Sequence, residues 1–289
     1  MKLATFTHEG STRVGAVVDG GILDLKDDDL PRDMLSLLQR GDGALDTARA
    51  LVAQGGDTIP LEAVTLHQPV LRPGKILAIG LNYADHIAET GGDAPKVQLW
   101  FNKQSTASNG PFDPVALPVA SHMLDYEGEL ALVIGKRCRH VPAERALEVI
   151  AGFMVINDVS VRDWQARSPT FQMGKSFDTH APMGPWMVTT DEIGDPHNLD
   201  IKTWVNGELR QDSNTKHLIF NINQQIEHLT TAFTLEPGDV IATGTSSGVA
   251  AAMKPPKWLV EGDQVKIEVE KIGAIECSIV RESGETVID

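Results

Sequence analysis

The sequence predicts an α+β protein rich in β-strands, and three observations lead to this fold class. Short apolar runs bounded by glycine or polar residues, such as 75–80 and 129–135, have the length and composition of buried strands. The dipeptide Asn206-Gly207 lies between two β-type runs and is a strong hairpin signal. Segment 263–280 alternates apolar and polar residues on both sides of a turn, which predicts a second hairpin. Because the chain is mostly of β-type after residue 75, a doubly wound parallel sheet is not expected.

Two helices are predicted among these strands. Pro142 and Gly152 bracket one apolar run, and proline at the start with glycine just past the end is typical of a helix. A second helix is predicted over 221–233, because its apolar residues from Ile222 to Phe233 share one helical face. Neither an internal repeat of roughly 20–50 residues nor a low-complexity tract is evident.

The first 68 residues are predicted to form a small α+β domain, and residues 69–289 a larger one. Short β-type runs at the N-terminus are separated by turn-forming residues, which predicts a meander. The apolar residues that follow have helical spacing, and Gly41 to Gly43 divide them into two short helices. Pro69 and Pro73 lie in a plausible linker between the two domains.

The composition excludes several classes of partner. The formal net charge is −15 and the sequence pI is about 5.0, so a nucleic acid or an anionic membrane would be repelled on average. No apolar run approaches the roughly 20 residues that span a bilayer, and the N-terminus lacks the apolar stretch of a signal peptide. Cys138 and Cys277 are too few for a disulfide framework. We therefore expect a soluble cytoplasmic protein without a nucleic-acid or membrane partner.

Three acidic residues lie at the ends of predicted buried strands. Glu127 and Glu129 are two residues apart, so on a strand their side chains point to the same face. Asp158 ends another apolar strand. Solvated strand ends are the simpler explanation for the glutamate pair alone, but a shared cation would explain all three acids. Oxygen ligands select Mg²⁺, Mn²⁺ or Ca²⁺ over zinc or copper.

His86 and Glu89 lie in a short predicted helix that ends at Gly91. Residues three apart share a helical face, and a glutamate beside an imidazole fixes its tautomer and raises its basicity, as in general-base catalysis. A solvent-exposed surface pair is the alternative explanation for this spacing.

Two further segments contain groups that suit an anionic substrate. Lys175 lies among small and loop-forming residues, where its charge would stabilise negative charge that develops on a substrate. Segment 240–249 is a strand that leads into a turn of glycine, threonine and serine, whose amides and hydroxyls suit a carboxylate or an oxyanion. A solvated lysine and a plain turn are the corresponding alternatives. The turn lacks the lysine of a nucleotide-binding P-loop.

Five motifs, in this order, resemble the fumarylacetoacetate hydrolase family. They are GLNYADHIAE, DYEGELALVIGK, NDVSVRDWQ, GKSFDTHAPMGP and LEPGDVIATGTSSGV. The resemblance extends over roughly residues 70 to 280, which is the larger domain. It implies a mixed β-sandwich roll with a small N-terminal α+β domain, a Mg²⁺ or Mn²⁺ site with Ca²⁺ as a substitute, an α-keto acid substrate and a homodimer.

The same resemblance implies roles for individual residues. The metal-binding acids that it indicates are Glu127, Glu129 and Asp158. His86 and Glu89 match a catalytic dyad on a lid that orders over the substrate, and Lys175 matches a residue that contacts the developing charge. The positions that it assigns to substrate binding are Tyr83, Arg162, Gln165, Gly244 and Thr245.

Three departures from the family pattern leave the metal acids and the dyad intact. Many relatives have an arginine where this chain has Leu81, which bears on how the distal end of a substrate is held. The segment 103–107 reads KQSTA where KPSTA is common, and the turn 243–248 reads TGTSSG where a proline usually follows the second threonine.

The predicted function is metal-dependent hydrolysis of a 3-acylpyruvate, of the fumarylpyruvate or maleylpyruvate type, in aromatic-compound catabolism. His86 with Glu89 would deprotonate a water, Lys175 with Gln165 would stabilise the oxyanion, and the metal would stabilise the departing pyruvate enolate. The same enolate arises in oxaloacetate decarboxylation and in isomerisation of 2-hydroxyhepta-2,4-diene-1,7-dioate, which are the alternatives within the family. Hydrolysis is favoured because the dyad is intact. A catalytically silent metabolite-binding protein is the alternative from another class.

Overall fold

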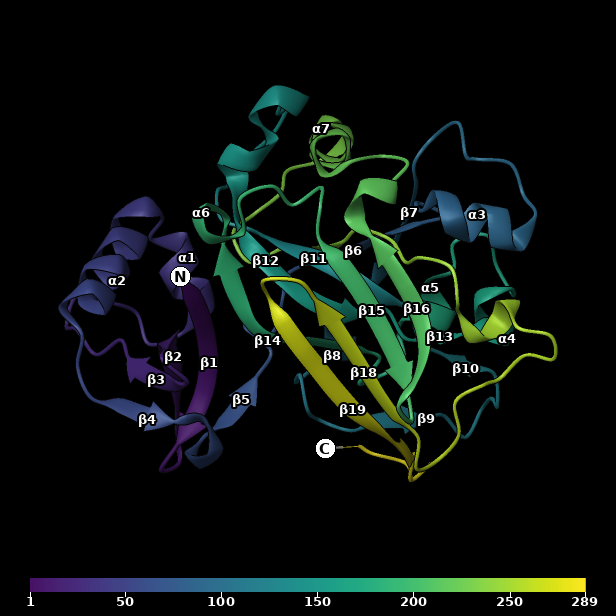
Figure 1. Ribbon diagram of the computed structural model, residues 1–289, viewed down its shortest axis with the longest axis horizontal. Coiled ribbons are helices and arrows are strands. Elements are labelled where there is room, and N and C mark those ends of the chain that lie inside the picture. The colour runs from purple at the N-terminus through teal and green to yellow at the C-terminus, as the bar shows by residue number, and fades with distance from the viewer. Residues whose placement is uncertain (289) are drawn as a thin grey trace.

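The computed structural model describes residues 1–288, and its β-rich architecture confirms the predicted fold class (Figure 1). Asp289, the last residue of the predicted larger domain, lies outside the described residues. The strands form one twelve-stranded sheet, one five-stranded sheet and one two-stranded ribbon. The two large sheets set the shape of the molecule, and the helices lie at their edges and ends.

The N-terminal segment forms the predicted meander and two helices. Its elements are β1 (Lys2–His8), β2 (Ser11–Val18), β3 (Gly21–Asp24), α1 (Met34–Gln39), α2 (Asp42–Gln54), β4 (Thr58–Pro60) and β5 (Thr65–His67). Asp33 caps α1 by accepting a hydrogen bond from the amide of Ser36 at 2.9 Å. Gly41 separates the two helices with a φ of 74°, a backbone conformation that favours glycine.

The N-terminal meander continues the sheet of the larger part of the chain. β1 pairs antiparallel with β14 (Ala181–Thr189), with Lys2 opposite Val188 and Leu3 opposite Met187. The segment, with its two helices, lies at one side of the molecule (Figure 1). One sheet therefore crosses residue 69, and the division into domains 1–68 and 69–289 stays a prediction.

The rest of the large sheet consists of strands that are mostly buried, except β7 at its edge. Its elements are β6 (Ile76–Gly80), β7 (Leu99–Lys103), β11 (Gly128–Ile134), β12 (Ile150–Asn157) and β17 (Val240–Ala242). They continue from β14 in the order β12-β11-β17-β6-β7, and every residue of β11 and β12 is buried. Burial on both faces explains why β11 and β12 are nearly continuous apolar runs in the sequence.

The five-stranded sheet packs against this part of the large sheet and completes the predicted sandwich (Figure 1). Its elements are β9 (Val115–Leu117), β15 (Asp200–Val205), β16 (Glu208–Asn214), β18 (Gln264–Val269) and β19 (Gly273–Arg281). Both predicted hairpins are present. Asn206 and Gly207 turn between β15 and β16 with φ values of 52° and 78°, and β18 pairs with β19. Leu132 and Phe153 of the central strands share a buried cluster with Ile267 of β18.

The helix predicted between Pro142 and Gly152 is wrong in type and in extent. Residues 143–149 form a 3-10 helix, and β12 already begins at Ile150, so Gly152 lies inside a strand. A Cβ atom on Gly152 would lie 2.4 Å from the carbonyl oxygen of Val188 in β14. Glycine is therefore needed for close strand packing here rather than for ending a helix.

The second predicted helix is α7 (Ile222–Ala232). Asn221 and Gln224 form a capping box at its start, and Ile226 with Leu229 packs into the buried cluster of the central strands. Phe233 lies just beyond the helix and is 36% exposed, so the apolar face ends one turn earlier than the sequence indicated.

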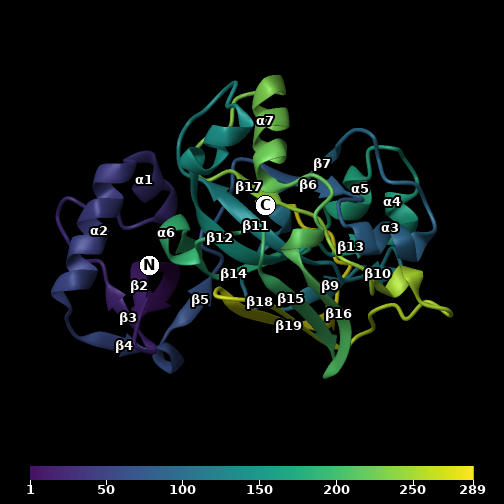
Figure 2. The same cartoon turned by 45° about the horizontal axis from the view of Figure 1, so that its top comes forward.

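The remaining elements lie around the ends of the sheets. They are α3 (Ala84–Thr90), β8 (Ser108–Asn109), β10 (Leu124–Asp125), β13 (Ser160–Val161), α4 (Arg162–Gln165), α5 (Gln172–Lys175), α6 (Thr190–Ile193) and 3-10 turns at 61–63, 105–107, 215–217 and 250–252. In both views α3, α4 and α5 gather on the side of the molecule opposite α1 and α2 (Figure 1, Figure 2). Over residues 1–288, no helix has the length and apolar character needed to cross a bilayer.

His180 precedes β14 and is fully buried. Its Nε2 donates a hydrogen bond to the carbonyl oxygen of Ala116 at 2.8 Å, and its ring stacks on Phe177 with 5.5 Å between centroids. Burial lowers the pKa of His180 from 6.5 to about 3, because desolvation disfavours the imidazolium. The folded protein therefore holds His180 neutral at a pH where the unfolded chain protonates it.

We predict that His180 makes the stability of the protein depend on pH. Because its folded pKa lies below 6.5, its contribution is fully present above that pH and is lost as the pH falls toward 3. From pH 7 to pH 5, the free energy of unfolding should fall by about 2 kcal/mol more in the unmodified protein than in His180→Phe. Urea denaturation of both proteins measures this, and an equal pH dependence would contradict it.

Candidate metal and catalytic site

The three predicted metal-binding acids meet where β11 and β12 lie side by side. Glu127 precedes β11, Glu129 lies within it, and Asp158 follows the last residue of β12. Because Gly128 pairs with Asn157, the start of one strand lies beside the end of the other. One carboxylate oxygen of each acid lies within 4.8 Å of the other two, and all three residues are buried.

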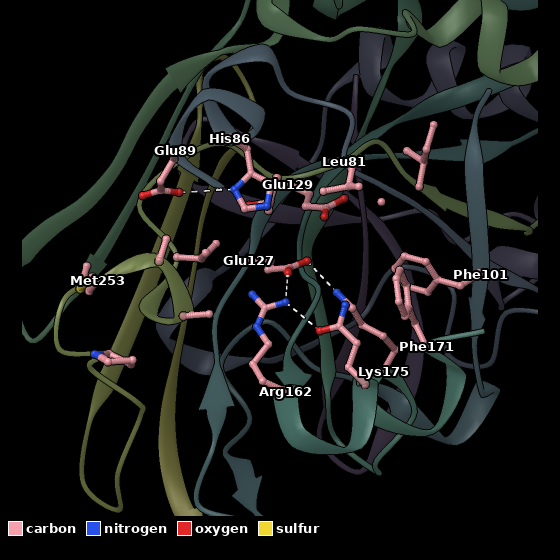
Figure 3. A pocket seen from close by; sticks show the side chains of 18 of the residues that line it. Leu81, His86, Glu89, Phe101, Glu127, Glu129, Arg162, Phe171, Lys175 and Met253 are labelled. Atoms are coloured by element: carbon pink, nitrogen blue, oxygen red, sulfur yellow. Dashed lines mark hydrogen bonds and ion pairs between the residues drawn. The ribbon is translucent and has the colours of Figure 1, made fainter. Parts of the chain in front are cut away.

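Two of these acids have cationic partners within hydrogen-bonding distance, and Figure 3 shows those of Glu127. Lys175, at the end of α5, places Nζ 2.7 Å from Oε2 of Glu127 and 2.8 Å from Oδ2 of Asp158. Arg162, at the start of α4, places Nη1 2.7 Å from Oε1 of Glu127. Burial alone would raise the pKa of Glu127, but Lys175 and Arg162 lower it to about 2. Glu127 is therefore held ionised.

Glu129 has no cationic partner among residues 1–288. It accepts a hydrogen bond from the backbone amide of Gly244 at 2.6 Å. Burial raises the pKa of Glu129 well above its ordinary value, and the nearby carboxylates of Asp158 and Glu127 raise it further. Without further positive charge, the site therefore favours the neutral form of Glu129, and Lys175 offsets this only in part.

The donor set fits a hard divalent cation. The three acids offer only carboxylate oxygens, which Mg²⁺, Mn²⁺ and Ca²⁺ prefer as ligands. A bound ion would supply positive charge next to Glu129 and would stabilise its ionised carboxylate. Glu127, Glu129 and Asp158 are the residues that would hold such an ion, and their role as ligands stays a prediction.

His86 and Glu89 lie together on α3, as the sequence spacing predicted. Nδ1 of His86 is 3.4 Å from Oε2 of Glu89, and the side chains are 12% and 24% exposed. The Glu89 carboxylate also accepts hydrogen bonds from the amide of Gly248 at 3.0 and 3.1 Å. Asp85 of the same helix accepts one from the hydroxyl of Ser213 at 2.6 Å. These contacts hold α3 near Glu127 and Glu129, and Figure 3 shows His86 together with these two residues.

A cavity of about 630 Å³ connects the dyad, the acids and the lysine. The predicted site residues that line it are His86, Glu89, Glu127, Glu129, Arg162, Gln165, Lys175 and Thr245. Asp158 lies next to the lining, in contact with Lys175, and Gly244 contributes its amide to Glu129. Tyr83 is fully buried outside the lining, and its hydroxyl has no partner within the described part of the chain. All five predicted substrate-binding roles stay predictions, those of Arg162, Gln165 and Thr245 in the lining as well as those of Gly244 and Tyr83.

Other residues that the sequence did not indicate complete the cavity and its support. Phe101 and Phe171 pack edge to face on one wall, with 6.0 Å between ring centroids (Figure 3). Lys103 donates a hydrogen bond to Oδ1 of Asp158 at 2.7 Å and is buried. Asp125, which is also buried, binds backbone amides behind the cavity. No strand predicted from the sequence ends at Lys103 or Asp125, so no signal like that of the metal-binding acids was available for them.

Residues 75–280 match the family model described as "Fumarylacetoacetate (FAA) hydrolase C-terminal". This segment is well over half of the chain and contains the acids, the dyad and Lys175. The chain belongs to the fumarylacetoacetate hydrolase family. The family resemblance inferred from the five motifs is thereby confirmed.

Relatives in the fumarylacetoacetate hydrolase family act on different substrates. The mitochondrial oxaloacetate tautomerase Fahd2a of Rattus norvegicus is 44% identical over 261 residues, covering 89% of this chain and 83% of that protein. The fumarylacetoacetate hydrolase of Exiguobacterium antarcticum is 35% identical with a TM-score of 0.85, covering 98% of this chain and 100% of that one. Maleylpyruvate hydrolase of Sphingobium sp. SYK-6, in complex with manganese(II) and pyruvate, is 35% identical with a TM-score of 0.81 and the same coverage. The protein is thus an enzyme of this family.

The comparisons overturn the predicted cytoplasmic location. That expectation depended on the lack of an apolar leader and of membrane-spanning runs, whereas the rat relative is named as a mitochondrial protein. Mitochondrial targeting segments are amphipathic and rich in arginine rather than apolar. A missing apolar stretch therefore does not indicate the cytoplasm.

We predict that Glu129 is required for tight binding of Mn²⁺. Glu129→Gln removes one anionic ligand and one negative charge, so the dissociation constant should rise at least about tenfold. Isothermal titration calorimetry with MnCl₂ measures this change. Glu144→Gln, an exposed position on the 3-10 helix before β12, is the matched control and should bind as the unmodified protein does. Equal affinity of Glu129→Gln and the control would contradict the assignment of Glu129.

Proposed function

We propose that this protein is an oxaloacetate tautomerase, which interconverts the enol and keto forms of a 2-oxo dicarboxylate. The observation that carries the proposal is the meeting of the His86–Glu89 pair and Lys175 with three carboxylates in one cavity. Tautomerisation needs a group that moves a proton and a site that stabilises an enolate. The 44% identity to the rat oxaloacetate tautomerase supports this choice of substrate.

The reaction moves one proton between two atoms of the substrate. Starting from the enol, the bond from hydrogen to the C2 oxygen breaks and a carbon–hydrogen bond forms at C3. The C2–C3 double bond becomes a single bond, the C2–O single bond becomes a carbonyl, and no atom is gained or lost. His86 is placed to carry the proton, because an imidazole both accepts and donates protons near neutral pH. Glu89, 3.4 Å from Nδ1, orients the ring and stabilises its protonated form.

The enolate intermediate carries negative charge that the site must stabilise. Burial alone would lower the pKa of Lys175, but Asp158 and Glu127 raise it above its ordinary value, so the ammonium persists. Lys175 and Arg162 direct positive charge toward the cavity that they line. A bound Mg²⁺ or Mn²⁺ supplies Lewis-acid stabilisation of the same enolate.

Hydrolysis of a 3-acylpyruvate is the second candidate function. The cavity of about 630 Å³ has more room than oxaloacetate requires. The similarity to a maleylpyruvate hydrolase in complex with manganese(II) and pyruvate also favours this reaction. Oxaloacetate decarboxylation and dienedioate isomerisation pass through related enolates, so the same side chains would serve them. A homodimer and a role in aromatic-compound catabolism belong to this candidate as predictions.

We predict that His86→Ala lowers the rate of oxaloacetate tautomerisation by about 10²–10⁴-fold, because it removes the proton carrier. The decay of enol absorbance with Mn²⁺ present measures the rate, and calorimetry should show unchanged Mn²⁺ binding. His228→Ala, exposed on α7, is the control and should retain full activity. Near-normal tautomerisation by His86→Ala would overturn the role of His86.

A substrate panel separates the candidate functions. The unmodified protein is assayed with oxaloacetate, fumarylpyruvate and maleylpyruvate, and both enol decay and pyruvate release are followed. Enol decay of oxaloacetate without pyruvate supports the tautomerase. Pyruvate from the acylpyruvates at a higher kcat/KM supports the hydrolase, and pyruvate from oxaloacetate supports a decarboxylase. In either of those cases the tautomerase proposal fails.

A further inference from the structure

One wall of the cavity has no part in the metal and dyad chemistry. It is formed by the segment after β17, and its lining residues are Val249, Ala251, Ala252, Met253, Lys254 and Pro256. Figure 3 shows Met253 on the side of the cavity opposite Phe101 and Phe171. This wall is mainly apolar, and Lys254 is its charged residue.

Lys254 differs from the other cations that line the cavity. Lys175 is paired with Glu127 and Asp158, and Arg162 is paired with Asp125 and Glu127. Within residues 1–288, no carboxylate lies within ion-pairing distance of Nζ of Lys254. The cavity therefore has one cation whose charge is available to a ligand.

The backbone that carries Lys254 is held in place. The buried carboxylate of Asp125 accepts hydrogen bonds from the amides of Ala250 and Ala251 at 2.8 and 3.0 Å. Arg162 donates to the same carboxylate from Nε at 2.8 Å, so this wall is coupled to the acid site. On the other side, Nη1 of Arg210 donates to Sδ of Met253 at 3.0 Å. These contacts fix the position of the backbone from which the Lys254 side chain extends.

The two ends of the cavity suit the two ends of a dicarboxylate. The end with Glu127, Glu129 and Lys175 suits the 2-oxo acid group of the proposed function. Val249, Ala251 and Ala252 provide apolar surface for carbon atoms, and Lys254 provides a positive charge beyond the reacting centre. An ammonium without a partner is a point charge that attracts a carboxylate.

We propose that Lys254 is a specificity-determining residue that binds the distal carboxylate of a 2-oxo dicarboxylate substrate. The inference depends on the proposed function for the position of the reacting end. It goes beyond that function because it states which side chain selects dicarboxylates over monocarboxylates. Lys254 acts in binding and has no part in the proton transfer.

The kinetic test compares two substrates that differ only at the distal end. They are the enol forms of oxaloacetate and of its C4 monomethyl ester, which is neutral at that end. Lys254→Met should lower kcat/KM for oxaloacetate roughly tenfold, mainly by raising KM, as expected for one charge-assisted hydrogen bond. The same variant should leave the ester unchanged, and Lys254→Arg should retain most of the activity with oxaloacetate.

A neighbouring lysine provides the matched control. Lys257 lies outside the cavity lining and pairs with Glu208 at 3.4 Å, so Lys257→Met removes the same charge from the same segment. It should change kcat/KM for neither substrate. An equal loss for both substrates in Lys254→Met, or a loss for neither, would overturn the inference. An equal effect of Lys257→Met would show that only the overall charge matters.

A binding measurement separates this inference from the proposed function. Calorimetry with the Mn²⁺-loaded protein compares malate, which has a distal carboxylate, with oxalate, which has none. Lys254→Met should raise the dissociation constant of malate roughly tenfold and leave that of oxalate unchanged. This result would support Lys254 even if oxaloacetate is not turned over. Unchanged malate binding in Lys254→Met, or no malate binding by the unmodified protein, would overturn it.

Discussion

The packing of three carboxylates between the start of β11 and the end of β12 is the constraint on which the rest of the site depends. Buried like charges this close disfavour joint ionisation unless positive charge compensates them. Lys175 and Arg162 compensate from two short helices, Lys103 from β7, and the Gly244 amide from the turn after β17. Elements distant in the sequence must therefore converge on this one point.

The parts of the structure that hold the acids differ in kind from those that meet a substrate. β11 and β12 are buried along their whole length and paired on both sides, which fixes the acids on a rigid frame. The substrate side consists of α3 and the segment 249–256, which are connected to the frame through a few polar contacts. Such a division permits one acidic centre to serve different substrates when the surrounding wall changes. The range of relatives, from a tautomerase to a maleylpyruvate hydrolase, agrees with this arrangement.

Much of the candidate site was accessible from the sequence because its signals are local. Glu127 and Glu129 share a strand face by their spacing, and His86 and Glu89 share a helical face by theirs. The structure brings both pairs into one cavity. Lys254 gave no such signal, because a lysine in a polar segment looks the same whether it faces solvent or a cavity.

By itself, the sequence determined the strands, the hairpin at Asn206-Gly207, the acid pair and the family. These features follow from periodicity, turn chemistry and ordered motifs, which act between near neighbours in the chain. Only the tertiary structure decided that β12 begins at Ile150, ahead of Gly152, that β1 extends the sheet at β14, and that Lys254 lines the cavity. Each of these features depends on contacts between residues far apart in sequence. Such contacts cannot be predicted from a local sequence pattern.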